Sequence, residues 1–176
     1  MFRLDNYMEK WAEAYLPLSH KKEDPAFFRM NDIFTVDEFL NHYNRLNKPV
    51  CGIVTHIKSR VNAVKRMNKP TYECAFLARA DERDYKAQAD AKESCWELMW
   101  AFLLRLDHDR QEAARVDRGS ALANLDLTDM SAETLGPITN GWFMLVLTID
   151  AQQKESRCYS DSDYDPDKLS AWKPFE

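Results

Sequence analysis

The residues best suited to bind a metal ion form an acidic run near the C-terminus. Residues 161–167 read DSDYDPD, and alternating carboxylates of this kind hold calcium in EF-hand loops. A loop that began at Asp161 would need glycine where Pro166 stands and an acid where Trp172 stands. A loop that began at Asp163 would place Pro174 at its twelfth position. The run therefore favours a solvated acidic loop over a calcium site.

Histidines and cysteines show neither the spacing of a zinc site nor that of a nucleophile. The cysteines are scattered without a CxxC pair, and no GxSxG sequence is present. Cys95 lies on the apolar stripe of an expected helix, which favours a buried, inert thiol over a catalytic one. No histidine has an acidic residue or cysteine at ligand spacing. The residues concerned are His20, His42, His56 and His108, with Cys51, Cys74, Cys95 and Cys158. The sequence predicts no catalytic residue, no metal and no cofactor, with reduced and unpaired thiols.

A basic set follows one polar strand face and the turn after it. Aromatic residues are not interleaved with it, as a stacking platform for nucleic acid would require. The net charge of -5 also argues against a general nucleic-acid binder. The set is either the solvated rim of a hairpin or a positively charged lip that contacts an acidic neighbouring subunit. Its members are Lys58, Arg60, Lys65, Arg66 and Lys69.

Composition bounds the kind of molecule that can present these residues. The chain has 176 residues, of which 45% are hydrophobic, enough for one domain with a substantial core. We expect a single domain over residues 1–153 and a polar tail over 154–176. Acidic residues and Lys10 interrupt the N-terminus, so it does not resemble a signal peptide, and no apolar stretch is long enough to span a membrane. The sequence predicts a soluble, cytoplasmic protein.

Three stretches have helical periodicity. Residues 4–16 place Leu4, Met8 and Trp11 on one face. Residues 35–46 begin with a capping box, in which Thr35 precedes Glu38. The longest helix is expected over about residues 83–113, with an apolar stripe that Trp96, Trp100 and Leu103 widen. A stripe this broad suits a helix that lies across a sheet and also packs on another helix.

Strand patterns occupy the regions on either side of the long helix. Residues 50–64 and 71–80 alternate with period two and predict an antiparallel hairpin. A weaker strand region ends near Pro137, which fits an edge position. Asn140-Gly141 is a hairpin turn signal, and the strand after it is apolar on both faces. We therefore expect an α+β domain: an antiparallel sheet of about four strands in two hairpins, one long helix on it, and additional N-terminal helices.

The order of these elements resembles the tail-terminator (tail-completion) proteins of long-tailed bacteriophages and prophages. The likeness rests on PTYECAFLARADERD leading into the long helix, and on LDLTDMSAETLGPITNGWFMLVLTI closing the sheet. The resemblance implies a non-enzymatic, virion-associated protein that assembles as a ring and contacts tail-tube or connector proteins. It implies neither direct nucleic-acid binding nor membrane binding. The alternative is a small-ligand-binding or regulatory domain with an apolar pocket between helix and sheet.

The strand after Asn140-Gly141 also predicts where copies of the chain would touch. If the N-terminal helices cover only an edge of the sheet, one apolar face of this strand stays exposed, and such patches mark contact surfaces. We expect a homo-oligomer whose interface uses this face or the basic hairpin. The predicted interface residues are Trp142, Met144, Val146, Lys58, Arg60, Lys65 and Arg66.

Overall fold

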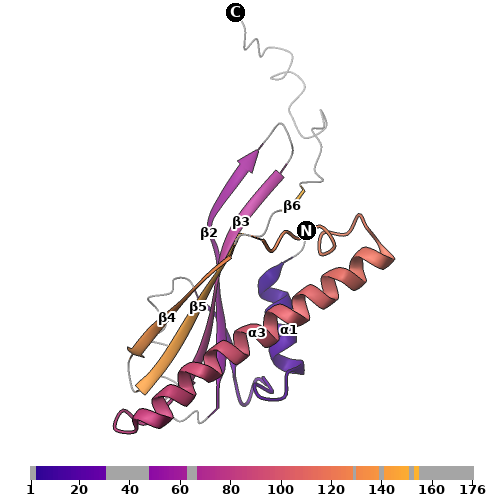
Figure 1. Ribbon diagram of the computed structural model, residues 1–176. Coiled ribbons are helices and arrows are strands. Elements are labelled where there is room, and N and C mark those ends of the chain that lie inside the picture. Colours follow the sequence, from indigo (N-terminus) through magenta and orange to yellow (C-terminus); the bar gives the residue numbers. More distant parts are fainter. Residues whose placement is uncertain are drawn as a thin grey trace, which may run out of the picture.

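The computed structural model describes residues 3–30, 48–62, 67–128, 130–138, 141–150 and 153–154, and these form an α+β fold (Figure 1). Its helices are α1 (Leu4–Ala14) and α3 (Tyr85–Val116). Its strands are β1 (Phe27–Met30), β2 (Val50–Asn62), β3 (Met67–Arg79), β4 (Met130–Ile138), β5 (Trp142–Asp150) and β6 (Gln153–Lys154).

The strands form one open and mostly antiparallel sheet. The order is β1-β2-β3-β5-β4, and the short β6 pairs with the start of β3. The two predicted hairpins, β2–β3 and β4–β5, are present, and β5 joins them by pairing antiparallel with β3. Phe76 of β3 stands opposite both Cys51 and Leu145, so these three side chains share one face of the sheet.

The expected count of about four strands is wrong, because the described residues form a sheet of six strands. β1 has only four residues, too few to show an alternating pattern, and its parallel pairing with β2 is a tertiary contact. β6 has two residues and crosses the expected boundary between residues 153 and 154. The tail beyond Lys154 lies outside the described residues. Of the expected N-terminal helices, α1 is confirmed, and the one over residues 35–46 also lies outside them.

Helix α3 lies diagonally across β3 and β5 (Figure 1). Asp84 caps its N-terminus, because Oδ1 accepts hydrogen bonds from the backbone N–H of Lys86 (2.9 Å) and Ala87 (3.0 Å). The apolar stripe read from the sequence is the face that packs on the sheet. Its buried members are Ala91, Cys95, Leu98, Met99, Phe102, Leu103 and Leu106.

Helix α1 packs on the same face of the sheet, beside α3. The Trp11 ring makes edge contacts with Phe102 of α3 (5.2 Å between centroids) and Phe76 of β3 (6.3 Å). An ion pair fastens the other side of α1 to β1: buried Asp5 accepts from Arg3 (2.6 Å) and Arg29 (3.2 Å). Burial raises the pKa of Asp5, but the hydrogen bonds from the two arginines outweigh it and hold the pKa below its usual value.

Candidate functional site: an exposed sheet edge beside the long helix

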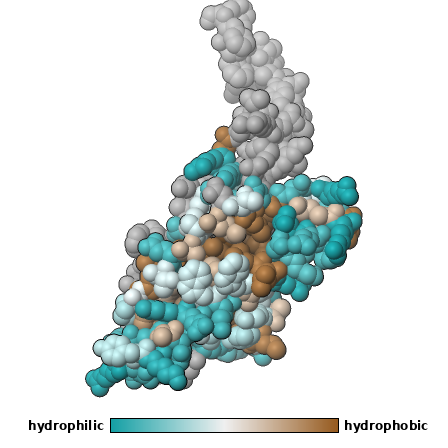
Figure 2. Space-filling model, viewed as in Figure 1, coloured by the Kyte–Doolittle hydropathy of each residue, from teal (hydrophilic) through white to brown (hydrophobic). Residues whose placement is uncertain are grey.

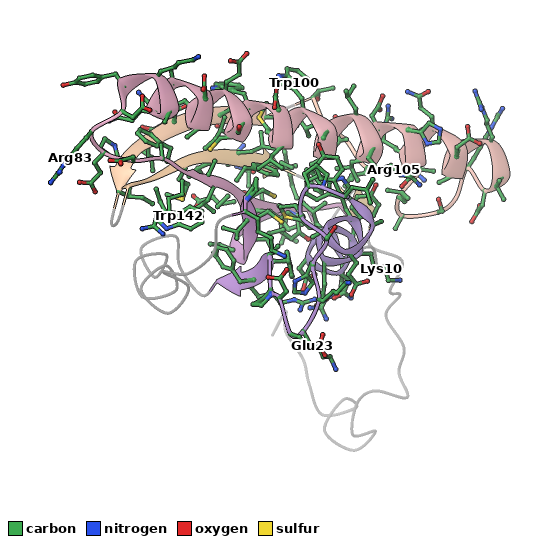
Figure 3. All side chains as sticks on the ribbon, turned by 90° about the horizontal axis from the view of Figure 1, so that it is seen from below. Lys10, Glu23, Arg83, Trp100, Arg105 and Trp142 are labelled. Carbon is green, nitrogen blue, oxygen red and sulfur yellow. The ribbon has the colours of Figure 1, made fainter. Side chains whose placement is uncertain are left out.

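The face of β5 that the sequence marked as a contact surface is buried within the chain. Trp142 has 0% of its surface exposed and Met144 has 4%, while Val146 is partly buried. Trp142 lies on the side of the sheet opposite α3 (Figure 3). Trp142 and Met144 both belong to the hydrophobic core, and Val146 packs against it, so the second apolar face of β5 is covered within the chain. The prediction that Trp142 and Met144 lie at an exposed interface is corrected.

Trp142 also has an unusual polar group for a core residue. Its indole Nε1–H is buried and has no hydrogen-bond acceptor in the part of the chain that the structure describes. A buried donor without an acceptor costs about 1–3 kcal/mol. The large apolar ring must offset this cost, which fits a role in packing.

The basic hairpin is described only in part. Arg60 is exposed on β2. Lys69 is partly buried, and its Nζ lies 3.7 Å from Asp150 Oδ2 on β5. Lys65 and Arg66 lie outside the described residues, as does the position of the Lys58 side chain. A joint basic surface therefore stays a prediction.

The structure places an open strand edge at β4. Every residue from Met130 to Thr134 is exposed, and β4 is the last strand of the sheet on its side. Within the described chain it pairs only with β5, so its outer backbone donors and acceptors face solvent. Met130, Ala132 and Thr134 stand opposite Ile149, Leu147 and Leu145, which places them on the helix-bearing face.

Helix α3 presents an apolar flank beside this edge. Trp96 is 39% exposed, Trp100 is 54% exposed and Leu104 is 66% exposed, and their spacing of four residues aligns them on one side of the helix. Figure 3 shows Trp100 on the outer side of α3. We call these three residues, with Met130, Ala132 and Thr134 of β4, the edge surface.

A groove of about 510 Å³ runs between α3 and the chain that leads into β4. Apolar side chains make most of its lining, including Trp100, Leu125 and Met130. Its charges come from Asp107, Arg110 and Asp126, and Asp107 pairs with Arg110 at 2.7 Å. In Figure 2 hydrophobic residues gather at the centre of this side of the molecule, and hydrophilic residues surround the two ends of α3. The groove thus joins the two parts of the edge surface.

The sequence contained a signal for this flank, because Trp96 and Trp100 widen the apolar stripe of the long helix. That width predicts a second helix packed on α3. Helix α1 does pack on α3, but at the opposite flank, where Ala101, Arg105 and Asp109 line a second groove of about 430 Å³ with α1. The tryptophan flank faces the β4 side instead.

The second groove contains a cluster of ionisable groups. Tyr7 donates to Asp109 Oδ2 (2.8 Å), and Arg105 donates to the same oxygen (2.9 Å). Burial and the hydrogen bond to Asp109 raise the Tyr7 pKa well above its usual value. His108 Nδ1 lies 3.2 Å from the other Asp109 oxygen. The Tyr7 phenol, which stays protonated beside the Asp109 carboxylate, thus joins α1 to α3 by a hydrogen bond.

The thiols fit the inert role that the sequence predicts. Burial raises the pKa of Cys51 and Cys74 well above the usual range and that of Cys95 to about 11. At neutral pH the nucleophilic thiolate is therefore scarce at all three sites. Cys51, Cys74 and Cys95 are unpaired. Cys158 and the acidic run from Asp161 fall outside the described ranges.

The two histidines whose side chains the structure describes lie on separate elements. His20 Nδ1 accepts from the backbone N–H of Ala26 (3.0 Å), which orders the connector before β1, and His108 lies on α3. Nothing is described of the His56 side chain, and His42 lies outside the described residues. Among the side chains that the structure describes, no three histidines, cysteines or acids are grouped as metal ligands would be.

Neither described helix has the length and apolar character needed to cross a membrane. Comparison of the sequence with protein-family models and with curated proteins gives no match.

Proposed function

We propose that this chain is a non-enzymatic assembly protein of a bacteriophage or prophage tail, of the tail-completion type. The observation that carries the proposal is the edge surface. It combines an open strand edge, which can accept another strand, with three large apolar side chains that stand in solvent beside it. Such a combination is costly for an isolated domain and useful for one that docks on another chain.

Two further features support an assembly role. The element order that resembles tail-completion proteins, a hairpin, a long helix and a second hairpin, is the order of β2, β3, α3, β4 and β5. The most reactive residue type of the sequence, cysteine, is held protonated at its three described buried positions. The proposed partners are other copies of this chain and tail-tube or connector proteins.

The test is deletion of the gene from its phage or prophage, followed by electron microscopy of the particles. We expect particles without complete tails, and rescue by the wild-type gene. Trp100→Glu should rescue poorly, because it places a charge in the edge surface. Tyr85→Glu is the matched control, since Tyr85 is an exposed aromatic residue on the same helix, 86% exposed and away from the groove. Normal tails after deletion would refute the proposal.

The second candidate is a small-ligand-binding domain, and the two grooves favour it. Their volumes of about 510 and 430 Å³ lie in the range of roughly 300–1,000 Å³ that is usual for ligand sites. Native mass spectrometry of protein purified from its own host tests it. A bound small molecule that is lost in Leu125→Arg, inside the first groove, would favour this candidate. Protein free of small molecules would count against it.

A further inference from the structure

We propose that the edge surface binds a second copy of the chain, with β4 pairing antiparallel to β4 of that copy and with Ala132 at the two-fold axis. The sheet would then run continuously through both copies. This deepens the proposed function, on whose self-association part it rests. A two-fold pair uses the same patch on both chains, so that patch must complement itself in hydrogen bonding, shape and charge.

Hydrogen bonding is self-complementary because a strand edge offers alternating donors and acceptors. From Met130 to Leu135 β4 pairs with β5 in continuous antiparallel register, so its outer edge is regular over six residues. Pro137 lies beyond this stretch, past the register shift that follows Leu135. Its lack of an N–H therefore leaves the pairing stretch intact.

The side chains of β4 select the register. Centring the pair on Ala132 places Met130 opposite Thr134 of the second copy, and Ser131 opposite Glu133. Neither pairing opposes like charges. Centring it one residue later would place the two Glu133 carboxylates directly opposite each other, which is destabilising. Even-numbered residues would face even-numbered residues, so both α3 helices would lie on the same side of the joined sheet.

The tryptophans fit the space between those two helices. Each α3 lies over β3 and β5, so the two helix axes would be separated by four strand spacings, roughly 19 Å. Helices in direct contact are about 8–10 Å apart. The remaining gap suits one layer of large side chains from each copy, and Trp96 and Trp100 project from the flank that faces it. Below them the β4 side chains Ala132 and Thr134 are small.

Charge is self-complementary along the same flank. Cys95 contacts the carbonyl of Phe143, and Trp100 lines the groove with Met130. Along the strand direction, Ala132 therefore lies beside the part of α3 between Cys95 and Trp100. The two-fold axis makes the α3 helices antiparallel. Lys92, placed over the Phe143 ring at 5.3 Å, and Asp107 lie on either side of that part of α3, so Lys92 would approach Asp107 of the second copy, a carboxylate that also pairs with Arg110 of its own chain at 2.7 Å. This attraction would occur twice.

Cysteine cross-linking tests the register. In a Cys158→Ser background, Ala132→Cys should form a covalent dimer under mild oxidation, because directly opposed residues have Cα atoms about 4.5–5.5 Å apart, within disulfide range. Glu133→Cys is the matched control: Glu133 is adjacent and also exposed, but it lies diagonal to its counterpart at about 7–8 Å, beyond that range. Cross-linking through Glu133→Cys alone, or through neither variant, overturns the proposal.

Sedimentation equilibrium across a concentration series tests the helix flank. The wild-type protein should have twice the mass of one chain. Trp100→Glu should weaken its self-association at least tenfold, and Tyr85→Glu should leave it unchanged. A strict monomer would refute the inference and leave the edge available for a strand of another protein. A dimer whose dissociation constant does not change in Trp100→Glu would also refute it. A larger ring that Trp100→Glu does not disrupt also refutes it while leaving the proposed function intact. A two-fold dimer, found together with normal tails after gene deletion, would support this inference and refute the proposed function.

Discussion

Phe102 is the residue through which α1, α3 and the sheet meet, so its truncation tests the packing of all three. Its side chain has no exposed surface. Its ring contacts Trp11 (5.2 Å), Phe76 (5.8 Å) and Tyr7 (6.1 Å). Phe102→Ala should lower the free energy of unfolding by about 3–5 kcal/mol through lost burial and the cavity. Each aromatic pair is worth about 0.5–1.5 kcal/mol beyond burial, which places the expected loss in the upper half of that range.

The assay is urea unfolding followed by far-ultraviolet circular dichroism at one protein concentration. Tyr85→Ala is the control, since that exposed ring on the same helix should change stability by less than about 0.5 kcal/mol. Phe102→Leu keeps much of the volume and loses the three ring pairs, so about 1.5 kcal/mol or more is expected. It also keeps the test valid if the alanine variant does not fold. A cost for Phe102→Ala no larger than that for Tyr85→Ala would refute the packing described.

A double-mutant cycle extends the same reasoning to the helix contact. Combining Trp11→Ala with Phe102→Ala should give a coupling free energy of at least about 0.5 kcal/mol, because the two rings touch. Strict additivity would mean that α1 does not pack against α3 in solution.

The remaining predictions concern one carboxylate, one turn and the thiols. Asp5→Asn should lower the free energy of unfolding by about 1–3 kcal/mol at neutral pH. Because the folded pKa of Asp5 is lowered, its stabilisation is complete above about pH 4 and is lost as pH falls, so unfolding curves of wild type and variant should converge in acid. Gly141→Ala should lower the free energy of unfolding by more than about 1 kcal/mol, because φ is +74° and a Cβ would lie 2.4 Å from the Ala80 carbonyl oxygen. Gly119→Ala is the control, and thermal unfolding should show little change, because a Cβ there would approach only one side-chain oxygen. Mass spectrometry after iodoacetamide treatment at pH 8 should find the buried thiols of Cys51, Cys74 and Cys95 unmodified until the protein is unfolded. Modification of the folded protein would contradict their burial.

Local patterns predicted the elements that are long and regular. The alternation in β2 and β3 and the helical stripe of α3 each extend over ten or more residues, so the hairpin and the helix could be read directly. β1 could not be read, because four residues carry no period and the strand exists only through its pairing with β2. The cap at Asp84 lies within two residues of the expected helix start.

Which face of a strand or helix is exposed could not be predicted from the sequence in the same way. Periodicity tells which residues share a face, but it does not tell which face the rest of the chain covers. The sequence therefore assigned Trp142 to a contact surface and Trp100 to helix packing, whereas the structure buries Trp142 and exposes Trp100. Burial of a face depends on which distant parts of the chain pack over it, and no local pattern contains that information.

The place of β5 between the two hairpins also determines how the chain can fold as it is synthesised. Arg79 pairs with Trp142 across 63 residues, and Thr71 with Asp150 across 79. Closing loops of this length is slow, and proteins dominated by such non-local pairings fold slowly. During translation β2, β3 and α3 emerge before β5, and the buried face of α3 lacks half of its sheet until Asp150 has left the ribosome. The nascent chain must therefore keep a hydrophobic helix face out of misfolded contacts until β5 has been synthesised, and a product truncated before Trp142 can never cover that face with β5.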